Sequence, residues 1–329
     1  EVGAYDQARG LYNRYFRRRG DDVTGLYRLG NLQWIMGDTE GSKQTYRRAV
    51  EGNVESAKSA KTVGVYCLEM GDIALGLEFL ERSTHLNRDY IDGQLSYALA
   101  LLLSGRLREG WERYDWRLAK TDHSKFIRPN AHWIAGTEVK SLFVSGEQGI
   151  GDQIMFASML QELKHYANEV TVQVDRRLVT LFQRSMPDIR VVDPTVRLSA
   201  ESHQAAIPMG SLGRFFRSHM DMFPKQPRQY LKVDEQRSRE IGRDLGQRKR
   251  ITIGISWYSA RKYTDLEKSV PLALLAKALS KDRVELVSLQ YGDARKPLLE
   301  LARESGITVQ RVASVDNYFD LDGLASVID

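Results

Sequence analysis

Hydrophobic and small residues in the first third of the chain recur at intervals of 34 residues. Four glycines mark the interval: Gly3, Gly37, Gly71 and Gly105. A bulky residue and a small one precede the last three of them, in the pairs Leu29–Gly30, Val63–Gly64 and Tyr97–Ala98. After each glycine come a small residue (Ala8, Ser42, Gly76, Gly110) and a bulky one (Tyr12, Tyr46, Leu80, Tyr114). The spacing predicts pairs of antiparallel helices that touch at the small residues and turn at the glycines.

A 34-residue helix pair is the tetratricopeptide pattern, and we expect such repeats over residues 1–120. Each repeat buries its apolar face on the next and leaves a concave groove. This groove usually binds a peptide or protein, and a spacer that positions the next domain is the alternative. Because Gly3 already occupies the turn position, we expect the first repeat to lack its first helix.

The pattern changes after residue 120. Residues 121–139 show no clear periodicity and are interpreted as a connector, after which apolar strands alternate with helices. Strands are expected at 141–145, 170–174, 189–192 and 204–208, and helices at 152–166, 177–185 and 211–221. Such alternation is typical of a parallel sheet covered by helices on both faces. It predicts a first α/β domain over residues 140–234.

A polar helix at 235–247 lies in a predicted interdomain linker, residues 235–250, and a second α/β series fills 251–329. Its strands are expected at 251–257, 284–290 and 307–312, and its helices at 271–280, 294–304 and 320–329. This series is short for a domain, whose usual size is about 100–150 residues. We therefore expect the second domain to be incomplete at its C-terminal end.

Composition narrows the function only slightly. The net charge of +5 comes from scattered Lys and Arg, which is more typical of solvated helix faces than of a nucleic-acid site. Cys67 is the single cysteine, which excludes an internal disulfide and suits a reducing, cytoplasmic setting. No apolar run approaches the ~20 residues of a membrane span. No Cys/His cluster has the spacing of a metal site.

Three glycines and an aspartate in "GEQGIGDQIMF" (146–156) form a candidate anion or active-site loop between a strand and a helix. A dinucleotide fingerprint needs a third glycine where Ile154 stands, and the Lys-Ser/Thr of a Walker loop is absent. Asp152 at the helix start is therefore either a helix cap or a functional carboxylate.

A second candidate loop follows the strand at 251–257. It carries Ser256, Ser259, Arg261, Lys262 and Lys268, at the edge where open α/β sheets bind ligands. Hydroxyls and cations there suit a diphosphate, and a solvated loop is the alternative. The acidic triplet at 320–322 resembles a metal-binding motif of some sugar transferases, but a cap at the start of the last helix explains it better.

The ordered set "GWERYDWRL", "HWIAG", "GEQGIGDQIMFASML", "IGISWYSARKYTDLEKSVPL" and "VSLQYG", after the repeats, resembles one family. It is the bacterial tetratricopeptide-repeat glycosyltransferases with a heptosyltransferase-like region, some of which are thought to modify flagellin. The resemblance covers roughly residues 25–329 and implies a two-Rossmann (GT-B type) fold that needs no metal. The family continues beyond Asp329 with a segment that grips the donor diphosphate. We therefore expect residues 1–329 alone to be inactive and to bind a sugar nucleotide weakly or not at all.

The resemblance also implies roles for single residues. Gly149, Gly151 and Asp152 match a G-x-G-D loop in which the aspartate is the proposed base, with Glu147 and Gln148 beside it on the acceptor side. Lys262 or Lys268 matches a basic residue near the donor phosphates, and Gln290 and Tyr291 would lie near the nucleoside. The implied function is transfer of a sugar from a nucleotide-sugar donor to a protein or glycan acceptor recruited by the repeats. A non-catalytic repeat scaffold with a degenerate α/β region is the alternative.

Overall fold

A computed structural model describes most of the chain. The described residues are 2–19, 22–51, 56–120, 132–134, 136–196, 198, 203–225, 229–246, 251–259, 269–281 and 284–329. They divide into two compact units, Glu1–Gly136 with Ile207–Gln226, and Thr137–Ala206 with Pro227–Asp329. Among the described residues, no helix is long and apolar enough to span a bilayer.

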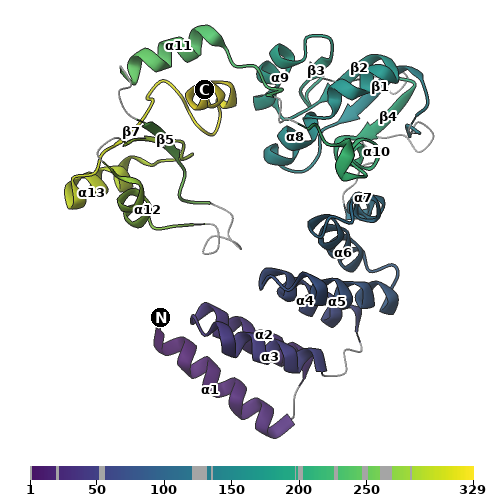
Figure 1. The fold of residues 1–329 in the computed structure, drawn as a ribbon, viewed down its shortest axis with the longest axis vertical. Coiled ribbons are helices and arrows are strands. Elements are labelled where there is room, and N and C mark those ends of the chain that lie inside the picture. Colours follow the sequence, from purple (N-terminus) through teal and green to yellow (C-terminus); the bar gives the residue numbers. More distant parts are fainter. Residues whose placement is uncertain are drawn as a thin grey trace. The chain divides into compact units, whose positions relative to one another are not determined.

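The first unit begins with the predicted helical repeats (Figure 1). Its helices are α1 (Val2–Arg19), α2 (Val23–Ile35), α3 (Thr39–Glu51), α4 (Ala57–Glu69), α5 (Ile73–Leu86), α6 (Ile91–Leu103) and α7 (Leu107–Tyr114), and the 3-10 helix η1 (Asp115–Lys120) follows. Gly37, Gly71 and Gly105 lie in the turns of three hairpins with φ of 81°, 82° and 82°. The expectation that Gly3 also occupies a turn is wrong, because Gly3 lies inside α1.

Each glycine turn closes in the same way. In the α4–α5 turn, the N–H of Gly71 donates to Leu68 O at 2.9 Å and the N–H of Asp72 to Cys67 O at 2.8 Å. This is the Schellman arrangement, which needs a left-handed residue after the helix. The same two bonds recur around Gly37 and Gly105, which explains why the glycines repeat with a fixed period.

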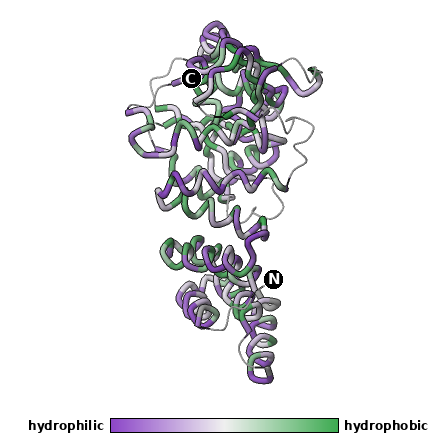
Figure 2. Tube along the Cα trace, turned by 90° about the vertical axis from the view of Figure 1, so that its right-hand side faces the viewer, coloured by the Kyte–Doolittle hydropathy of each residue, from purple (hydrophilic) through white to green (hydrophobic). Residues whose placement is uncertain are grey.

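The small residues of the repeat lie where paired helices touch, as predicted. A Cβ atom added to Gly30 would lie 2.6 Å from the Tyr46 ring, and one added to Gly76 or Gly110 would meet Leu68 or Leu102 at 2.6 or 2.8 Å. Hydrophobic and hydrophilic residues interleave along these helices (Figure 2), and the apolar ones form the core between them.

Residues 207–225 pack on the last repeat. They form η5 (Met209–Leu212), α10 (Gly213–Phe216) and η6 (Met220–Met222) instead of the single helix expected at 211–221. Trp111 Nε1 donates to Arg217 O at 2.9 Å, and the buried Arg117 donates to Ser211 Oγ at 2.9 Å. A Cβ on Gly213 would lie 2.6 Å from the Trp111 ring. The close approach to Trp111 explains why a glycine stands in this segment.

The first sheet has the order β3-β2-β1-β4. Its strands are β1 (Val139–Ser145), β2 (Ala167–Gln173), β3 (Arg190–Val192) and β4 (Ala205–Pro208), with parallel pairing of β1 with β2 and of β2 with β3. The helix expected at 152–166 is two pieces, α8 (Ile150–Ala157) and η3 (Leu160–His165), and η4 (Arg176–Leu178) and α9 (Val179–Ser185) follow β2. The buried Leu142, Val144 and Val172 supply part of its core.

The second sheet has the order β5-β6-β7, again parallel. Its strands are β5 (Ile251–Ile255), β6 (Val284–Ser288) and β7 (Val309–Gln310), with α11 (Glu235–Asp244), α12 (Leu272–Leu279), α13 (Arg295–Ser305) and α14 (Leu321–Ile328) around them. Trp257 and Leu286 are buried in a core with Leu301. The predicted fold class, helical repeats followed by parallel-sheet α/β structure, is confirmed.

Candidate functional site

The loop after β1 is held tightly against β2. The N–H of Gly146 donates to Gln173 O at 2.6 Å, and a Cβ at position 146 would lie 2.4 Å from that oxygen. Only glycine allows this approach. The next residue, Glu147, is buried at 8% exposure.

The residue that needs positive φ in this loop is Gln148, with φ of 61°. Glycine adopts positive φ without steric cost, so Gly149 and Gly151 are the positions that the sequence would assign to this conformation, and that assignment is wrong. Gly149 has φ of −85°, and Gly151 is absent from the positive-φ glycines of the described chain. Space does not demand a glycine at position 151 either, since nothing lies within 4 Å of a Cβ there.

Asp152 is the third residue of α8, not its cap. The helix begins at Ile150 with Gly149 as the N-cap, and the Asp152 carboxylate oxygen Oδ2 accepts the Gly149 N–H at 3.0 Å. A carboxylate at this position satisfies the cap amide and opposes the positive helix end. The side chain is half-buried, and Oδ1 makes no hydrogen bond within the described part of the chain. Asp152 therefore supports the helix start and keeps one oxygen for another partner.

At the edge of the second sheet, Gln290 orders the loop after β5. Its Oε1 accepts from the N–H groups of Trp257 and Tyr258, both at 2.9 Å, and from Ser256 Oγ at 3.1 Å. Its Nε2 donates to the carbonyls of Tyr258 and Tyr291. The amide of Gln290 is thus fully used inside the protein, at 5% exposure. Ser259 also lies in this loop, whereas Arg261, Lys262 and Lys268 lie outside the described residues.

Tyr291 lines a pocket of about 360 Å³. The lining residues are Gln290, Tyr291, Gly292, Arg311, Asp316, Asn317, Tyr318 and Phe319. Asn317 Nδ2 donates to the carbonyls of Ser288 and Gln290, both at 3.2 Å, which fixes the pocket to the end of β6. Its aromatic walls suit a planar ring, and Arg311 supplies a positive charge. The sequence indicated Gln290 and Tyr291 but no residue of the segment 311–319.

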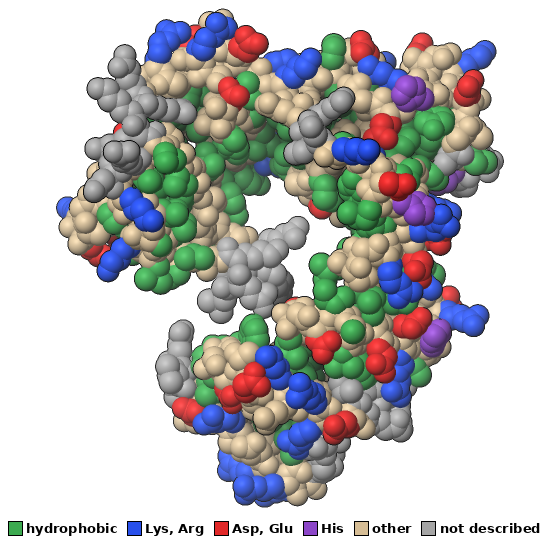
Figure 3. Space-filling view, viewed as in Figure 1, with side chains coloured by type: hydrophobic (Ala, Val, Ile, Leu, Met, Phe, Trp, Pro, Cys, Tyr) green, Lys and Arg blue, Asp and Glu red, His purple; other side chains and the backbone are tan. Residues whose placement is uncertain are grey.

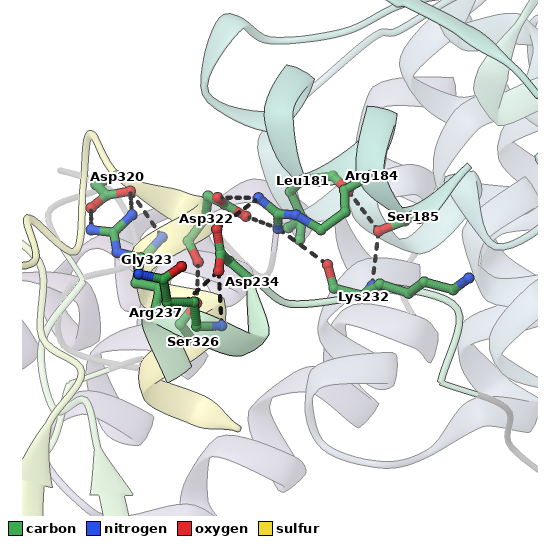
Figure 4. Close-up of polar contacts among 11 residues, drawn as sticks. Leu181, Arg184, Ser185, Lys232, Asp234, Arg237, Asp320, Asp322, Gly323 and Ser326 are labelled. Carbon is green, nitrogen blue, oxygen red and sulfur yellow. Dashed lines mark hydrogen bonds and ion pairs between the residues drawn. The ribbon is translucent and has the colours of Figure 1, made fainter. Parts of the chain in front are cut away.

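The two aspartates of the Asp-Leu-Asp segment 320–322 each bind an arginine, as Figure 4 shows. Asp320 caps α14 by accepting the Gly323 N–H at 2.8 Å, which confirms the cap interpretation, and it pairs with Arg237. Asp322 accepts two bonds from Arg184, at 2.6 and 2.7 Å. These bonds raise the pKa of Arg184. Among the described residues, no group of three His, Cys, Asp or Glu side chains could hold a metal ion.

A group of polar side chains on the repeats is joined by hydrogen bonds. Asn31 Nδ2 donates to Tyr66 Oη at 2.9 Å, Asn31 Oδ1 accepts from Tyr46 at 2.6 Å, and Tyr27 bonds Tyr66. Burial raises the pKa of both Tyr46 and Tyr66, so they stay protonated. Charges of both signs are interspersed over the face of the repeats seen in Figure 3. Burial also raises the pKa of the Cys67 thiol to about 12, which makes it unreactive.

The chain is similar to a curated bacterial protein. Protein FlbA of Caulobacter vibrioides (strain ATCC 19089 / CIP 103742 / CB 15) is 27% identical over 379 aligned positions, which cover 96% of this chain and 63% of FlbA. The chain thus spans 63% of the length of this relative. No family model matches the chain.

Solved structures match part of the chain at low similarity. MamA from Desulfovibrio magneticus RS-1 is 13% identical with a TM-score of 0.31, over 38% of this chain and 70% of MamA. YrrB, described as a TPR protein with an unusual peptide-binding site, is 18% identical with a TM-score of 0.31, over 37% of this chain and 62% of YrrB. At these TM-scores the similarity carries no argument, and the assignment of the repeats rests on the hairpins and turns described above.

Proposed function

We propose that the chain is part of a glycosyltransferase that moves a sugar from a nucleotide-sugar donor to a protein or glycan acceptor. One observation carries the proposal: an aromatic-walled pocket lies at the carboxyl edge of a parallel sheet, where open α/β sheets bind nucleotides. Tyr291, Tyr318 and Phe319 offer ring faces to a nucleobase, and Arg311 offers a cation to a phosphate.

Asp152 is the proposed base. In the transfer, the Asp152 carboxylate takes the proton of the acceptor hydroxyl while that oxygen bonds to the anomeric carbon of the sugar. The bond from the anomeric carbon to the phosphate oxygen breaks, and the nucleoside diphosphate leaves with the electron pair. Arg261, Lys262 and Lys268 are proposed to stabilise the charge of that diphosphate. No metal enters this scheme.

The repeats are proposed to recruit the acceptor, which by the resemblance is a flagellin-like protein. Exposed apolar side chains on α2 and α6, including Trp34 at 45% and Leu99 at 50%, offer contact area for a polypeptide. The single, buried Cys67 fits a cytoplasmic setting. We include that location in the proposal.

A non-catalytic scaffold is the second candidate. It is favoured by one observation: both Asp152 and Gln290 have structural roles, the first on the Gly149 amide and the second in the loop after β5. A scaffold would keep these bonds without any donor.

Nucleotide binding separates the two functions. Calorimetry of the full-length protein with ADP, UDP, GDP and CMP should show saturable binding of at least one of them. Tyr318→Ala should weaken this binding about fivefold or more, since base stacking on an aromatic ring contributes about 1–3 kcal/mol. Tyr15→Ala, an exposed tyrosine of α1, is the control and should change nothing. If no nucleotide binds and no sugar nucleotide is hydrolysed, the scaffold is correct.

A further inference from the structure

Arg177, in η4 after β2, has its guanidinium held in a fixed plane. Nε and Nη2 donate to the two carboxylate oxygens of Asp175, at 2.9 and 3.0 Å. A bidentate pair of this kind orients the planar group as well as binding it. These bonds lower the pKa of Asp175 and raise the pKa of Arg177. The side chains are only 23% and 30% exposed.

The same guanidinium holds Tyr318, a wall of the aromatic pocket. Nη1 donates to Tyr318 O at 3.1 Å, and the central carbon lies 4.7 Å from the centre of the Tyr318 ring. The first contact fixes the backbone, and the second is a cation–π interaction with the ring. Tyr318 lies next to Tyr291 and Phe319, with ring centroids 6.0 and 4.8 Å away.

Apart from Arg177 and the two neighbouring rings, Tyr318 depends on a short turn for its position. Its side chain is 46% exposed, and its turn depends on Asp316, whose carboxylate accepts the N–H groups of Tyr318 and Phe319 at 2.9 and 3.0 Å. A half-exposed ring on a short turn has several rotamers open to it. Contact with the guanidinium selects one of them.

Asp175, the partner of Arg177, also contacts the helix that carries the proposed catalytic base, Asp152. The N–H of Asp175 donates to Gln153 Oε1 at 2.8 Å, and Gln153 is the buried neighbour of Asp152 on α8. The turn that carries Arg177 is therefore anchored to the helix that carries Asp152. One short segment touches both the acceptor-side helix and a wall of the pocket.

We propose that Arg177 is a positioning residue that sets the Tyr318 wall of the pocket for the planar base of a nucleotide, and that it does so from the first sheet. This inference rests on the proposed function, in which the pocket takes the nucleoside. Arg177 touches neither the base nor the reacting sugar. It acts through Tyr318.

Hydrogen exchange of the protein without ligand tests the positioning. Arg177→Ala should speed exchange of the Tyr318 and Phe319 amides about tenfold, since their turn loses the bond at Tyr318 O. Arg176→Ala is the matched control, because Arg176 is the exposed neighbour in the same turn. Arg177→Lys keeps the positive charge beside Asp175 without the fork, and should also speed exchange. Unchanged exchange in both Arg177 variants would overturn the inference.

Nucleotide affinity tests the link to the pocket. Arg177→Ala should weaken binding about 5–20-fold, and in turnover it should raise KM more than it lowers kcat. In a double-mutant cycle with Tyr318→Leu, the two losses should be less than additive, because both remove the same wall. Fully additive losses would overturn the inference. Faster exchange in a protein that binds no nucleotide would support the positioning of Tyr318 and refute the proposed function.

Discussion

Replacement of Gly64 by alanine should destabilise the repeats. The added methyl group would lie 2.6 Å from Leu80 Cγ and 3.0 Å from both Leu80 N and Gly76 O. Leu80 is fully buried, and the other two atoms are backbone, so no side-chain rotation relieves the contact. Helices α4 and α5 must move apart to restore ordinary distances. Overpacking of this kind costs about 1–3 kcal/mol.

Gly10 provides a control with the opposite sign. It lies inside α1, exposed, with nothing within 4 Å of an added Cβ. Gly10→Ala should therefore stabilise its helix by about 0.5–1 kcal/mol, the ordinary preference for alanine over glycine. Hydrogen exchange of the α4, α5 and α1 amides in the whole protein measures both effects. A Gly64→Ala variant as stable as wild type would refute the close approach of α4 and α5.

Four further predictions concern the α/β unit. Asp152→Asn keeps an oxygen for the Gly149 amide and should change stability little, yet turnover of the full-length enzyme should fall by about 10²–10⁴-fold if Asp152 is the base. Asp152→Ala should also lose about 0.5–2 kcal/mol of stability, and an Asn variant with full turnover would leave Asp152 only its bond to the Gly149 amide. Asp322→Asn should lower the stability of α14 by about 1–3 kcal/mol, measured as faster hydrogen exchange of its amides. The control Asp188→Asn, at 69% side-chain exposure, should lower stability by less than about 1 kcal/mol. Arg177 keeps the folded pKa of Asp175 below its unfolded value, so this carboxylate stabilises the fold above about pH 4 and loses that effect as the pH falls through the folded pKa. In chemical denaturation, the free energy of unfolding should therefore fall less between about pH 5 and pH 2 for Asp175→Asn than for the wild type, and an equal fall would contradict the pairing. Ser145→Ala and Ser288→Ala should each raise the free energy of unfolding by about 1 kcal/mol, since both hydroxyls are buried without a partner among the described residues, and a lower value would show that the hydroxyls are bonded.

The repeats could be predicted from the sequence because their determinants are local. The left-handed turn at Gly71 and the helix contact at Gly76 each depend on residues within one repeat. Gly3 shows the limit of such a pattern, since it matches the spacing but lies inside α1.

The position of the loop after β1 was predicted, but the residues that shape its turn were not. Its strand, turn and helix follow from the apolar run and the glycines. The requirement for glycine at position 146 comes from the Gln173 carbonyl on β2, and the positive φ falls on Gln148. Both depend on how β1 and β2 pair, which no local pattern contains.

The pocket could be predicted only in part, for the same reason. Gln290 and Tyr291 follow a predicted strand directly, so their place at its carboxyl end was readable. Arg177 and Tyr318 are far apart in sequence and follow strands of different sheets, so their contact depends on tertiary structure. The exposed aromatic pair Tyr318–Phe319, just before a capped helix, was the one local signal.

The two buried serines bear on the choice between enzyme and scaffold. Ser145 and Ser288 are the last residues of β1 and β6, each 2% exposed, and neither hydroxyl has a hydrogen-bond partner in the described chain. An unpaired buried hydroxyl costs about 1–3 kcal/mol, which alanine would recover. In a scaffold without catalytic function, such unpaired hydroxyls at the carboxyl edges of both sheets would only lower stability. These are the edges that carry the Asp152 loop and the aromatic pocket, and stability given up there is the expected mark of a functional site. The two serines are therefore consistent with the proposed enzyme, and nucleotide binding remains the test that separates it from the scaffold.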